Sequence, residues 1–322
     1  MIYLNDRDIR QLGIDWPKLV ETVEHVAALL QTRDTVQPLK PYLRFGDPAN
    51  RIIAMPAYVG GNLRACGIKW IASFPGNRLR GLPRAHNTIV LNDPDTGMPL
   101  AIFQSGLLNA LRTAAVSGAM LQSWLKRRPG RNVTAGIVGW GPIGRAHLSM
   151  LKALLADRLE WTLLFDAGGI DPASVPDNVR GSVSIATDWR ETYRHADVFI
   201  TCTTASERYI DEPPPPGTLL LNVSLRDYMP HSVRSLNAVV VDDWREVCRE
   251  NTDIERLHLA FGLSERDAVT LKQAIHENGL DRFPEDEPVF FNPMGMAAFD
   301  IGIAHRYYKL ALRDHAGLPL EP

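Results

Sequence analysis

Short apolar runs recur through the second half of the chain, with helical or polar stretches between them. Each run has the length of a strand and lacks alternation of apolar and polar positions, which is typical of parallel strands buried on both faces. The runs lie at residues 133–138, 161–165, 196–202, 218–223 and 238–242. Their alternation with helical stretches predicts an α/β fold with a doubly wound, Rossmann-type parallel sheet.

The first half of the chain has a different pattern. Asp15 is a candidate helix N-cap with Pro17 behind it, and apolar positions at helical spacing continue to Leu30. A second helical pattern follows nearer the middle of the chain. Strand-like stretches lie at residues 51–55, 67–73, 88–92 and 100–104, and the helical pattern covers 107–125. Turn residues between the last two strands predict a hairpin. This half therefore predicts an α+β domain.

Three glycines follow the apolar run 133–138 and open an amphipathic stretch. In this G-x-G-x-x-G pattern Gly139 makes the tight turn, Gly141 admits a pyrophosphate, and Gly144 lets the helix pack on its strand. Pro142 suits the first helical turn, where no N–H is needed. Asp166 ends the next strand at the place of a ribose-binding carboxylate, and no arginine follows it directly, which favours NAD over NADP.

These patterns divide the 322 residues into two domains. Residues 116–296 are predicted to form the NAD-binding Rossmann domain. Residues 1–115 are then left for substrate binding. A last helical stretch from Met296 to about Arg313 is expected to pack on this first domain, so the C-terminal helix, about 297–322, is assigned to it.

Composition narrows the function classes. Hydrophobic residues at 45%, charged residues at 22% and a net charge of -2 suit a globular protein without general attraction to nucleic acid or anionic membranes. No apolar run approaches the ~20 residues that span a bilayer. The N-terminal residues lack signal-peptide features, so the cytoplasm is the expected location. Three scattered cysteines and nine histidines without zincin spacing predict no disulfide and no bound metal.

Several cations in the first half are candidates for binding an anionic substrate. Lys69 lies in an apolar strand and Arg112 in an apolar helix, where each charge is costly without an anionic partner. Either could instead form a structural ion pair or extend its charge to solvent. Lys40, Arg44 and Arg84 lie in neighbouring loops, and for such residues a solvated surface position is the alternative.

Asp227 follows the apolar run 218–223 in a polar turn. Ligands of an open α/β sheet bind outside the carboxyl ends of its strands, so this carboxylate is placed to reach one. There it could accept a proton or activate water. The alternative is a turn aspartate bonded to its own backbone.

Taken together, these segments resemble the ornithine cyclodeaminase/mu-crystallin family along nearly the whole chain. The motifs are Gly67-Ile68-Lys69, Ser73-Phe74-Pro75-Gly76-Asn77, Leu111-Arg112-Thr113-Ala114-Ala115, Gly139 to Gly144, Thr203-Thr204-Ala205 and Asn222 to Asp227. Within the family, a branch of dehydrogenases that form L-2,3-diaminopropionate for siderophores and peptide antibiotics is most similar. The branch features are residues 37–42, 81–85, 91–94 and 291–296.

The resemblance implies roles for particular residues. Lys69 and Arg112 would bind substrate carboxylate, Lys69 would also serve catalysis, and Asp227 would be the catalytic acid/base. The family's first substrate-binding arginine has no clear match, and Lys40 and Arg44 both lie near its place, with Arg84 as a further candidate. The implied cofactor contacts are Thr113, Gly139, Gly141, Pro142, Ile143, Gly144, Asp166, Thr203, Thr204 and Ser224. Family members pair through the N-terminal domain, so a homodimer is implied.

The implied reaction is NAD-dependent oxidative hydrolysis of N-(1-amino-1-carboxy-2-ethyl)glutamate to 2-oxoglutarate and L-2,3-diaminopropionate. One alternative within the family is an ornithine cyclodeaminase, which makes proline and ammonia, or a related imino or amino acid dehydrogenase. Cyclodeaminases carry a glycine pair before the aspartate, whereas this chain has Leu225 and Arg226, which argues against ornithine. A different class remains open, a binding protein that holds a nucleotide and a small ligand without turnover.

Overall fold

The computed structural model describes residues 1–321, apart from the side chain of Arg78. The chain divides into two compact units. Unit 1 comprises Met1–Arg112 and Gly295–Pro322, and unit 2 comprises Thr113–Met294. The division falls within helix α3 (Gly106–Lys126). Among the described residues, no helix is both long and apolar enough to cross a membrane.

Unit 1 is built on one mainly antiparallel sheet. Its strands are β1 (Ile2–Asn5), β2 (Thr35–Val36), β3 (Tyr42–Leu43), β4 (Arg51–Val59), β5 (Ala65–Ser73), β6 (Ala85–Asn92), β7 (Pro99–Gln104) and β16 (Leu318–Pro319). They are ordered β16-β1-β7-β6-β5-β4-β2, with β3 also paired to β4. The predicted hairpin is confirmed, because β6 and β7 pair antiparallel around the turn after Asn92. The pair β1 and β7 is parallel.

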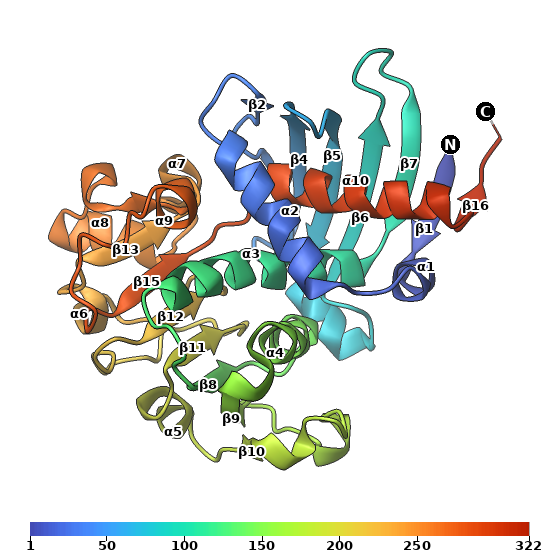
Figure 1. The fold of residues 1–322 in the computed structure, drawn as a ribbon. Coiled ribbons are helices and arrows are strands. Elements are labelled where there is room, and N and C mark those ends of the chain that lie inside the picture. The colour runs from blue at the N-terminus through green and yellow to red at the C-terminus, as the bar shows by residue number, and fades with distance from the viewer. Residues whose placement is uncertain (322) are drawn as a thin grey trace. The chain divides into compact units, whose positions relative to one another are not determined.

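Helices cover one face of this sheet. They are α1 (Asp6–Gln11), α2 (Trp16–Leu29) and α10 (Ala297–Arg313). Figure 1 shows α10 crossing the strands, and it packs against α2, β4, β5 and β6. Asp15 caps α2 by accepting the N–H of Lys18, as predicted. The final helix ends at Arg313, as its apolar pattern predicted, so residues 314–321 of the C-terminal segment assigned as 297–322 lie outside the helix.

The opposite face of the unit 1 sheet carries apolar side chains that remain partly exposed. In β5 the buried residues Lys69 and Ser73 point to the helical side. The alternate positions point away from it, among them Ile68 and Trp70, and the Trp70 side chain is 44% exposed. Unit 1 thus has one face closed by its own helices and one apolar face that its own helices do not cover.

Unit 2 is a doubly wound parallel sheet, which confirms the predicted fold class. Its strands are β8 (Val133–Val138), β9 (Leu159–Phe165), β10 (Val183–Ile185), β11 (Val198–Thr201), β12 (Leu219–Asn222), β13 (Ala238–Val241), β14 (Val269–Thr270) and β15 (Val289–Asn292), ordered β10-β9-β8-β11-β12-β15-β13-β14. The helices are α4 (Pro142–Leu155), α5 (Trp189–Arg194), α6 (Pro230–Val233), α7 (Trp244–Val247), α8 (Asp253–Phe261) and α9 (Leu271–His276).

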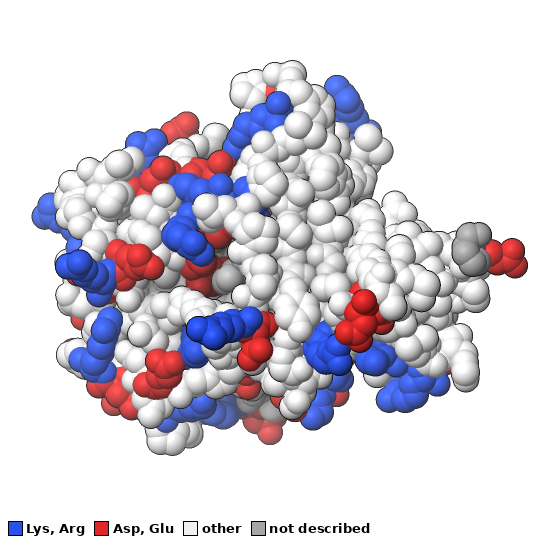
Figure 2. Space-filling view, turned by 90° about the horizontal axis from the view of Figure 1, so that it is seen from above, with Lys and Arg blue, Asp and Glu red and all other residues white. Residues whose placement is uncertain are grey.

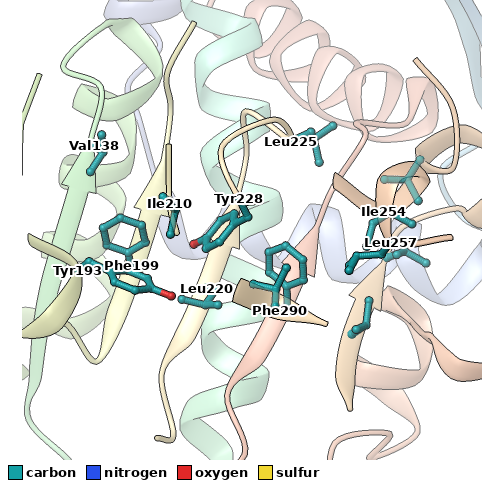
Figure 3. Close-up of a cluster of buried hydrophobic side chains, with 14 of the residues drawn as sticks. Val138, Tyr193, Phe199, Ile210, Leu220, Leu225, Tyr228, Ile254, Leu257 and Phe290 are labelled. Carbon is teal, nitrogen blue, oxygen red and sulfur yellow. The ribbon is translucent and has the colours of Figure 1, made fainter. Parts of the chain in front are cut away.

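Strand β15 was not predicted, yet it lies in the centre of this sheet between β12 and β13. Only its first three residues, Val289 to Phe291, are apolar, so this run is shorter than those that predicted the other strands. The strand supplies Phe290 to the core in Figure 3, where the Phe290 ring lies 5.0 Å from that of Tyr228. Tyr193 packs at 4.8 Å on Phe199 in the same cluster. This packing fixes the chain segment directly after Asp227.

Charge on the protein is mixed in sign. On the face drawn in Figure 2, lysine and arginine side chains are interspersed with aspartate and glutamate. Salt bridges such as that between Arg190 and Asp211, at 3.0 Å, join side chains of opposite sign in the described part of the chain. The face shown therefore presents no broad region of one sign, as the net charge of -2 suggests.

Candidate active site

The three glycines of the turn after β8 differ in how much space each leaves for a side chain. Gly139 has a φ of 100°, and a Cβ there would lie 2.5 Å from the Cys202 carbonyl oxygen. A Cβ on Gly144 would lie 2.1 Å from the Gly139 carbonyl oxygen, so α4 packs too closely for any side chain. A Cβ on Gly141 would meet nothing within 4 Å. The first and third glycines serve the fold, whereas the second leaves open space.

The N-terminus of α4 begins beside that space. Gly141 is the N-cap and makes no side-chain cap, Pro142 occupies the first turn, and Ile143 follows half-buried. The first N–H groups of a helix carry partial positive charge and suit an anion such as a pyrophosphate. The structure thus provides the backbone arrangement that the glycine pattern requires.

Asp166 directly follows β9, and its carboxylate accepts hydrogen bonds from the glycine turn. One of its carboxylate oxygens accepts the N–H of Trp140 at 2.7 Å, and the other accepts the N–H of Gly168 at 2.9 Å. Each carboxylate oxygen can accept a further hydrogen bond. Asp166 can therefore brace the turn and still bind a hydroxyl group such as one from a ribose.

Asp227 is fully buried, and two hydroxyl groups donate to its carboxylate. The Thr203 hydroxyl donates to one oxygen and the Ser224 hydroxyl to the other. The Thr203 N–H also donates to the Ser224 hydroxyl at 3.1 Å. A Cβ on Gly139 would be 3.1 Å from the Thr203 nitrogen, so this group adjoins the glycine turn. The carboxyl ends of β8, β11 and β12 thus bring these predicted residues together.

Hydroxyl groups, and not the neighbouring Arg208, bond to the Asp227 carboxylate. The nearby Arg208 pairs with Asp253 instead, at 2.7 Å, and hydroxyl groups satisfy Asp227. A hydroxyl can donate to an ionised carboxylate or accept from a protonated one. Thr203 and Ser224 can thus accommodate Asp227 in both protonation states, which suits a residue that exchanges a proton.

The remaining predicted cofactor residues are Thr204 and Thr113. Thr204 is exposed beside Thr203, and no contact of its side chain supports a role. Thr113 follows Arg112 in α3 and is half-buried. Among residues 1–321, no group of three or more histidine, cysteine and acidic side chains is arranged to hold a metal ion.

In unit 1, Lys69 and Arg112 share one carboxylate, that of Asp300 in α10. The Lys69 ammonium and the Arg112 Nε each lie 2.9 Å from its Oδ1. Asn109 also accepts from Lys69, at 2.6 Å. An ammonium has three N–H donors, and these two acceptors use two of them. Both cations are therefore held in place by an anionic partner, as their apolar setting predicted.

Burial and neighbouring charge set the protonation of this group. Burial lowers the pKa of Lys69 to about 8, although the Asp300 carboxylate opposes the shift. Burial acts to raise the pKa of Asp300, but Arg112 and Lys69 together outweigh it and hold that pKa below its ordinary value. Asp300 is thus ionised at neutral pH, and Lys69 is the group that titrates just above it.

Lys40 joins the same part of unit 1. Its ammonium is buried and donates to the Gly295 carbonyl oxygen at 2.8 Å. Gly295 has a φ of 82°, and a Cβ there would lie 2.8 Å from the Arg112 guanidinium. The Lys40 charge is close enough to lower the pKa of Lys69. Lys40, Lys69 and Arg112 therefore form one group of three cations, called the cation cluster below.

The other two candidate cations lie elsewhere. Arg44 is exposed, donates to the Pro48 carbonyl oxygen in its own loop and lies over the Tyr42 ring. Arg84 donates to the hydroxyl of Ser73 at 3.2 Å, and Ser73 is the last residue of β5. Of the two residues that compete for the family's first arginine position, the structure brings Lys40 to the cation cluster.

Asp300 and Asn109 are the residues that sequence reasoning missed here. A usable signal existed, since Asp300 is an acidic residue inside the apolar stretch of the last helix, as Lys69 is a cation inside an apolar strand. Two unlike charges in apolar segments predict each other as partners. Asn109 gave no such signal, because a single amide in a helix is ordinary.

Comparisons with known proteins extend over the whole chain. A model of the ornithine cyclodeaminase/mu-crystallin family matches residues 14–313. An N-((2S)-2-amino-2-carboxyethyl)-L-glutamate dehydrogenase of Staphylococcus aureus is 35% identical, over 99% of this chain and 98% of the relative. The solved Delta(1)-pyrroline-2-carboxylate reductase of Thermococcus litoralis, in complex with NADH and L-proline, is 26% identical with a TM-score of 0.87, over 99% of this chain and 100% of that one. A solved archaeal alanine dehydrogenase dimer with bound NAD shares the fold, with a TM-score of 0.78 and 23% identity over 100% of this chain and 99% of that one.

The glycine turn yields a prediction about stability. Replacing Gly144 with alanine should lower the free energy of unfolding by about 1–3 kcal/mol, the usual cost of an overpacked contact, because its Cβ meets a backbone oxygen. Gly141→Ala is the matched control, since its Cβ meets nothing and its φ of -78° suits alanine. Urea denaturation of both variants measures the difference. Equal midpoints for Gly144→Ala and the wild type would contradict the packing argument.

Proposed function

This chain belongs to the ornithine cyclodeaminase/mu-crystallin family, and from that premise we propose that it oxidises N-(1-amino-1-carboxy-2-ethyl)glutamate with NAD. Water then hydrolyses the resulting imine to 2-oxoglutarate and L-2,3-diaminopropionate. The 35% identical relative from Staphylococcus aureus, named for the corresponding substrate, supports this choice. The product would serve siderophore or peptide antibiotic synthesis.

The observation that carries the proposal is the cation cluster of unit 1. Lys40, Lys69 and Arg112 are all buried, and Asp300 is the carboxylate that pairs with two of them. These three cations lie in one group, and lysine and arginine bind carboxylates through charge-assisted hydrogen bonds. The proposed substrate has three carboxylates, so it supplies negative charge that an amino acid with a single carboxylate lacks. We assign substrate carboxylate binding to these three residues.

The residues of unit 2 fit NAD. The open space at Gly141, the uncapped start of α4 and the Asp166 carboxylate suit the pyrophosphate and a ribose. Thr203 and Ser224 lie beside them. Bound NAD supplies an acceptor for the hydride that leaves the glutamate α-carbon. The protein has to orient the substrate and to manage protons.

Asp227 is assigned the proton transfers. Its carboxylate would take a proton from the substrate amine or from the water that attacks the imine, and return it to the departing amine. The Thr203 and Ser224 hydroxyls keep the carboxyl group in one orientation during both steps. The overall balance is substrate, NAD and water in, and 2-oxoglutarate, L-2,3-diaminopropionate, NADH and a proton out.

A second candidate is an imino acid reductase or a cyclodeaminase. It is supported by the Thermococcus litoralis reductase, which is 26% identical with a TM-score of 0.87. Such an enzyme binds a substrate with one carboxylate, whereas the proposed substrate offers three carboxylates to the cation cluster.

A homodimer is also proposed, through the apolar face of the unit 1 sheet. Trp70 is 44% exposed there and Ile68 lies on the same face. Exposed apolar surface of this kind is typical of a protein contact. A second copy would cover it without using the face that carries Lys69.

The first prediction on function concerns the substrate. Purified protein with NAD and N-(1-amino-1-carboxy-2-ethyl)glutamate should form one NADH per molecule consumed, because the oxidation is not reversed within a cycle. Absorbance at 340 nm measures it, with ornithine, alanine and glutamate in parallel. Ammonia from ornithine without net NADH would instead identify a cyclodeaminase. NADH consumption with pyrroline-2-carboxylate alone would identify a reductase, and tight binding without any turnover would identify a binding protein.

A second prediction concerns Asp227. Asp227→Asn should lower kcat by about 100-fold or more, the usual scale for a general base, because an amide cannot take up the proton. NAD affinity, measured by fluorescence titration, should stay within about twofold of the wild type, since the glycine turn is unchanged. Near-normal kcat in this variant would remove Asp227 from the mechanism.

A third prediction follows from the pKa of Lys69, which burial lowers to about 8. The charged form binds carboxylate, so kcat/KM should be at its plateau below pH 8 and fall by up to about tenfold per pH unit above it. This profile reports the free enzyme. In Lys69→Arg the cation stays charged, so the fall near pH 8 should disappear even if the plateau is lower. An unchanged alkaline limb in Lys69→Arg would contradict the assignment.

A further inference from the structure

We propose that Asp253 is a positioning residue that holds Asp227 in its working orientation. The inference rests on the proposed proton-transfer role of Asp227. Asp253 is the first residue of α8 and is 1% exposed. It lies 26 positions beyond Asp227 in the sequence, and nothing in the pattern of the chain marked it.

The Asp253 carboxylate contacts the Asp227 turn directly. Its Oδ2 accepts the backbone N–H groups of Asp227 at 3.1 Å and of Tyr228 at 3.2 Å. The same oxygen accepts from the Asn222 amide at 2.9 Å, at the end of β12. Arg208 donates to the other oxygen at 2.7 Å. One carboxylate therefore ties the strand end to the residue that carries the proposed acid/base group.

The turn needs this support because its backbone is strained. Leu225 has a φ of 67°, in the left-handed region that costs a residue other than glycine about 1–2 kcal/mol. Its carbonyl oxygen accepts the Asp253 N–H at 2.8 Å, and its own N–H donates to the Asn222 side chain at 3.1 Å. Such a conformation persists where the surroundings hold it from several sides.

Helix capping does not account for Asp253. The N-cap of α8 is Thr252, whose hydroxyl accepts the N–H of Glu255 at 3.1 Å. The Asp253 side chain is thus not the cap of the helix, and it turns toward residues 222–228 instead. A carboxylate can accept all four of these donors, whereas the amide of asparagine would direct an N–H group at some of them.

Burial of the ionised Asp253 carboxylate costs free energy. Burial raises the pKa of Asp253 to about 6, against the opposing effects of Arg208 and Asn222. A buried acid that serves only packing could be replaced by an apolar residue without this cost. Asp253 keeps its charge in the place where several N–H donors of the Asp227 turn converge.

The test is a double-variant cycle on the full chain, in the 340 nm assay with whichever amino or imino acid turns over. Asp253→Asn should lower kcat by about 10- to 100-fold and leave NAD affinity within about twofold, because only proton transfer is disturbed. In the Asp227→Asn background the same substitution should change kcat by less than about twofold. Equal losses in both backgrounds would show a general structural role and overturn the proposal.

Two further variants serve as a replacement and as a control in the double-variant cycle. Asp253→Glu retains the charge with a longer side chain, and it replaces Asp253→Asn in the cycle should that variant fail to fold. Asp243→Asn is the matched control, because Asp243 caps α7 in the same unit by accepting the N–H of Glu246. It should change stability and kcat little, because asparagine caps a helix about as well as aspartate. A control that behaves like Asp253→Asn would contradict the proposal.

A structural readout separates this inference from the proposed function. A crystal structure of Asp253→Glu should show the Asp227 carboxylate displaced from the Thr203 or Ser224 hydroxyl. An Asp227 carboxylate still bonded to both hydroxyls would overturn the inference, whatever the substrate. Displacement of Asp227 together with a wild-type protein that turns over none of the substrates would sustain the positioning role and overturn the proposed function.

Discussion

Unit 1 depends on a single buried carboxylate that neutralises cations from distant parts of the sequence. Asp300 of α10 receives Lys69 of β5 and Arg112 of α3, all three largely buried. Removing one partner of such a group typically costs about 3–5 kcal/mol, because the remaining charges stay buried without compensation. The last helix must therefore lie across the sheet in the register that brings Asp300 to both cations.

Unit 2 also contains a buried carboxylate, and its hydrogen-bond donors are neutral. Asp227 is as buried as Asp300, but hydroxyl groups rather than cations satisfy its carboxylate. A carboxylate between two cations is locked in its ionised form, whereas one between hydroxyls can gain or lose a proton and keep its hydrogen bonds. The two buried acids thus have different surroundings, with cations around Asp300 and hydroxyl groups around Asp227.

The sequence allowed prediction of those features that depend on neighbours along the chain. The glycine turn, the hairpin and the capped helix α2 follow from local spacing, and Lys69 was conspicuous in an apolar strand. Asp253 and the central strand β15 could not be predicted in this way. Their roles arise from contacts across the sheet, and a four-residue strand or an acidic residue at a helix start looks the same in many surface segments.

Leu225 shows why the Asp227 turn is rigid. A left-handed leucine is unfavourable by about 1–2 kcal/mol, yet burial of a leucine side chain contributes about 1.5–3 kcal/mol. Leu225 is 5% exposed and belongs to the core cluster of Tyr228 and Phe290 (Figure 3). The two effects are of similar size, so packing alone leaves little margin for the strained conformation. The hydrogen bonds from Asp253 and Asn222 supply that margin, which is why the polar network and the apolar core must act together to place Asp227.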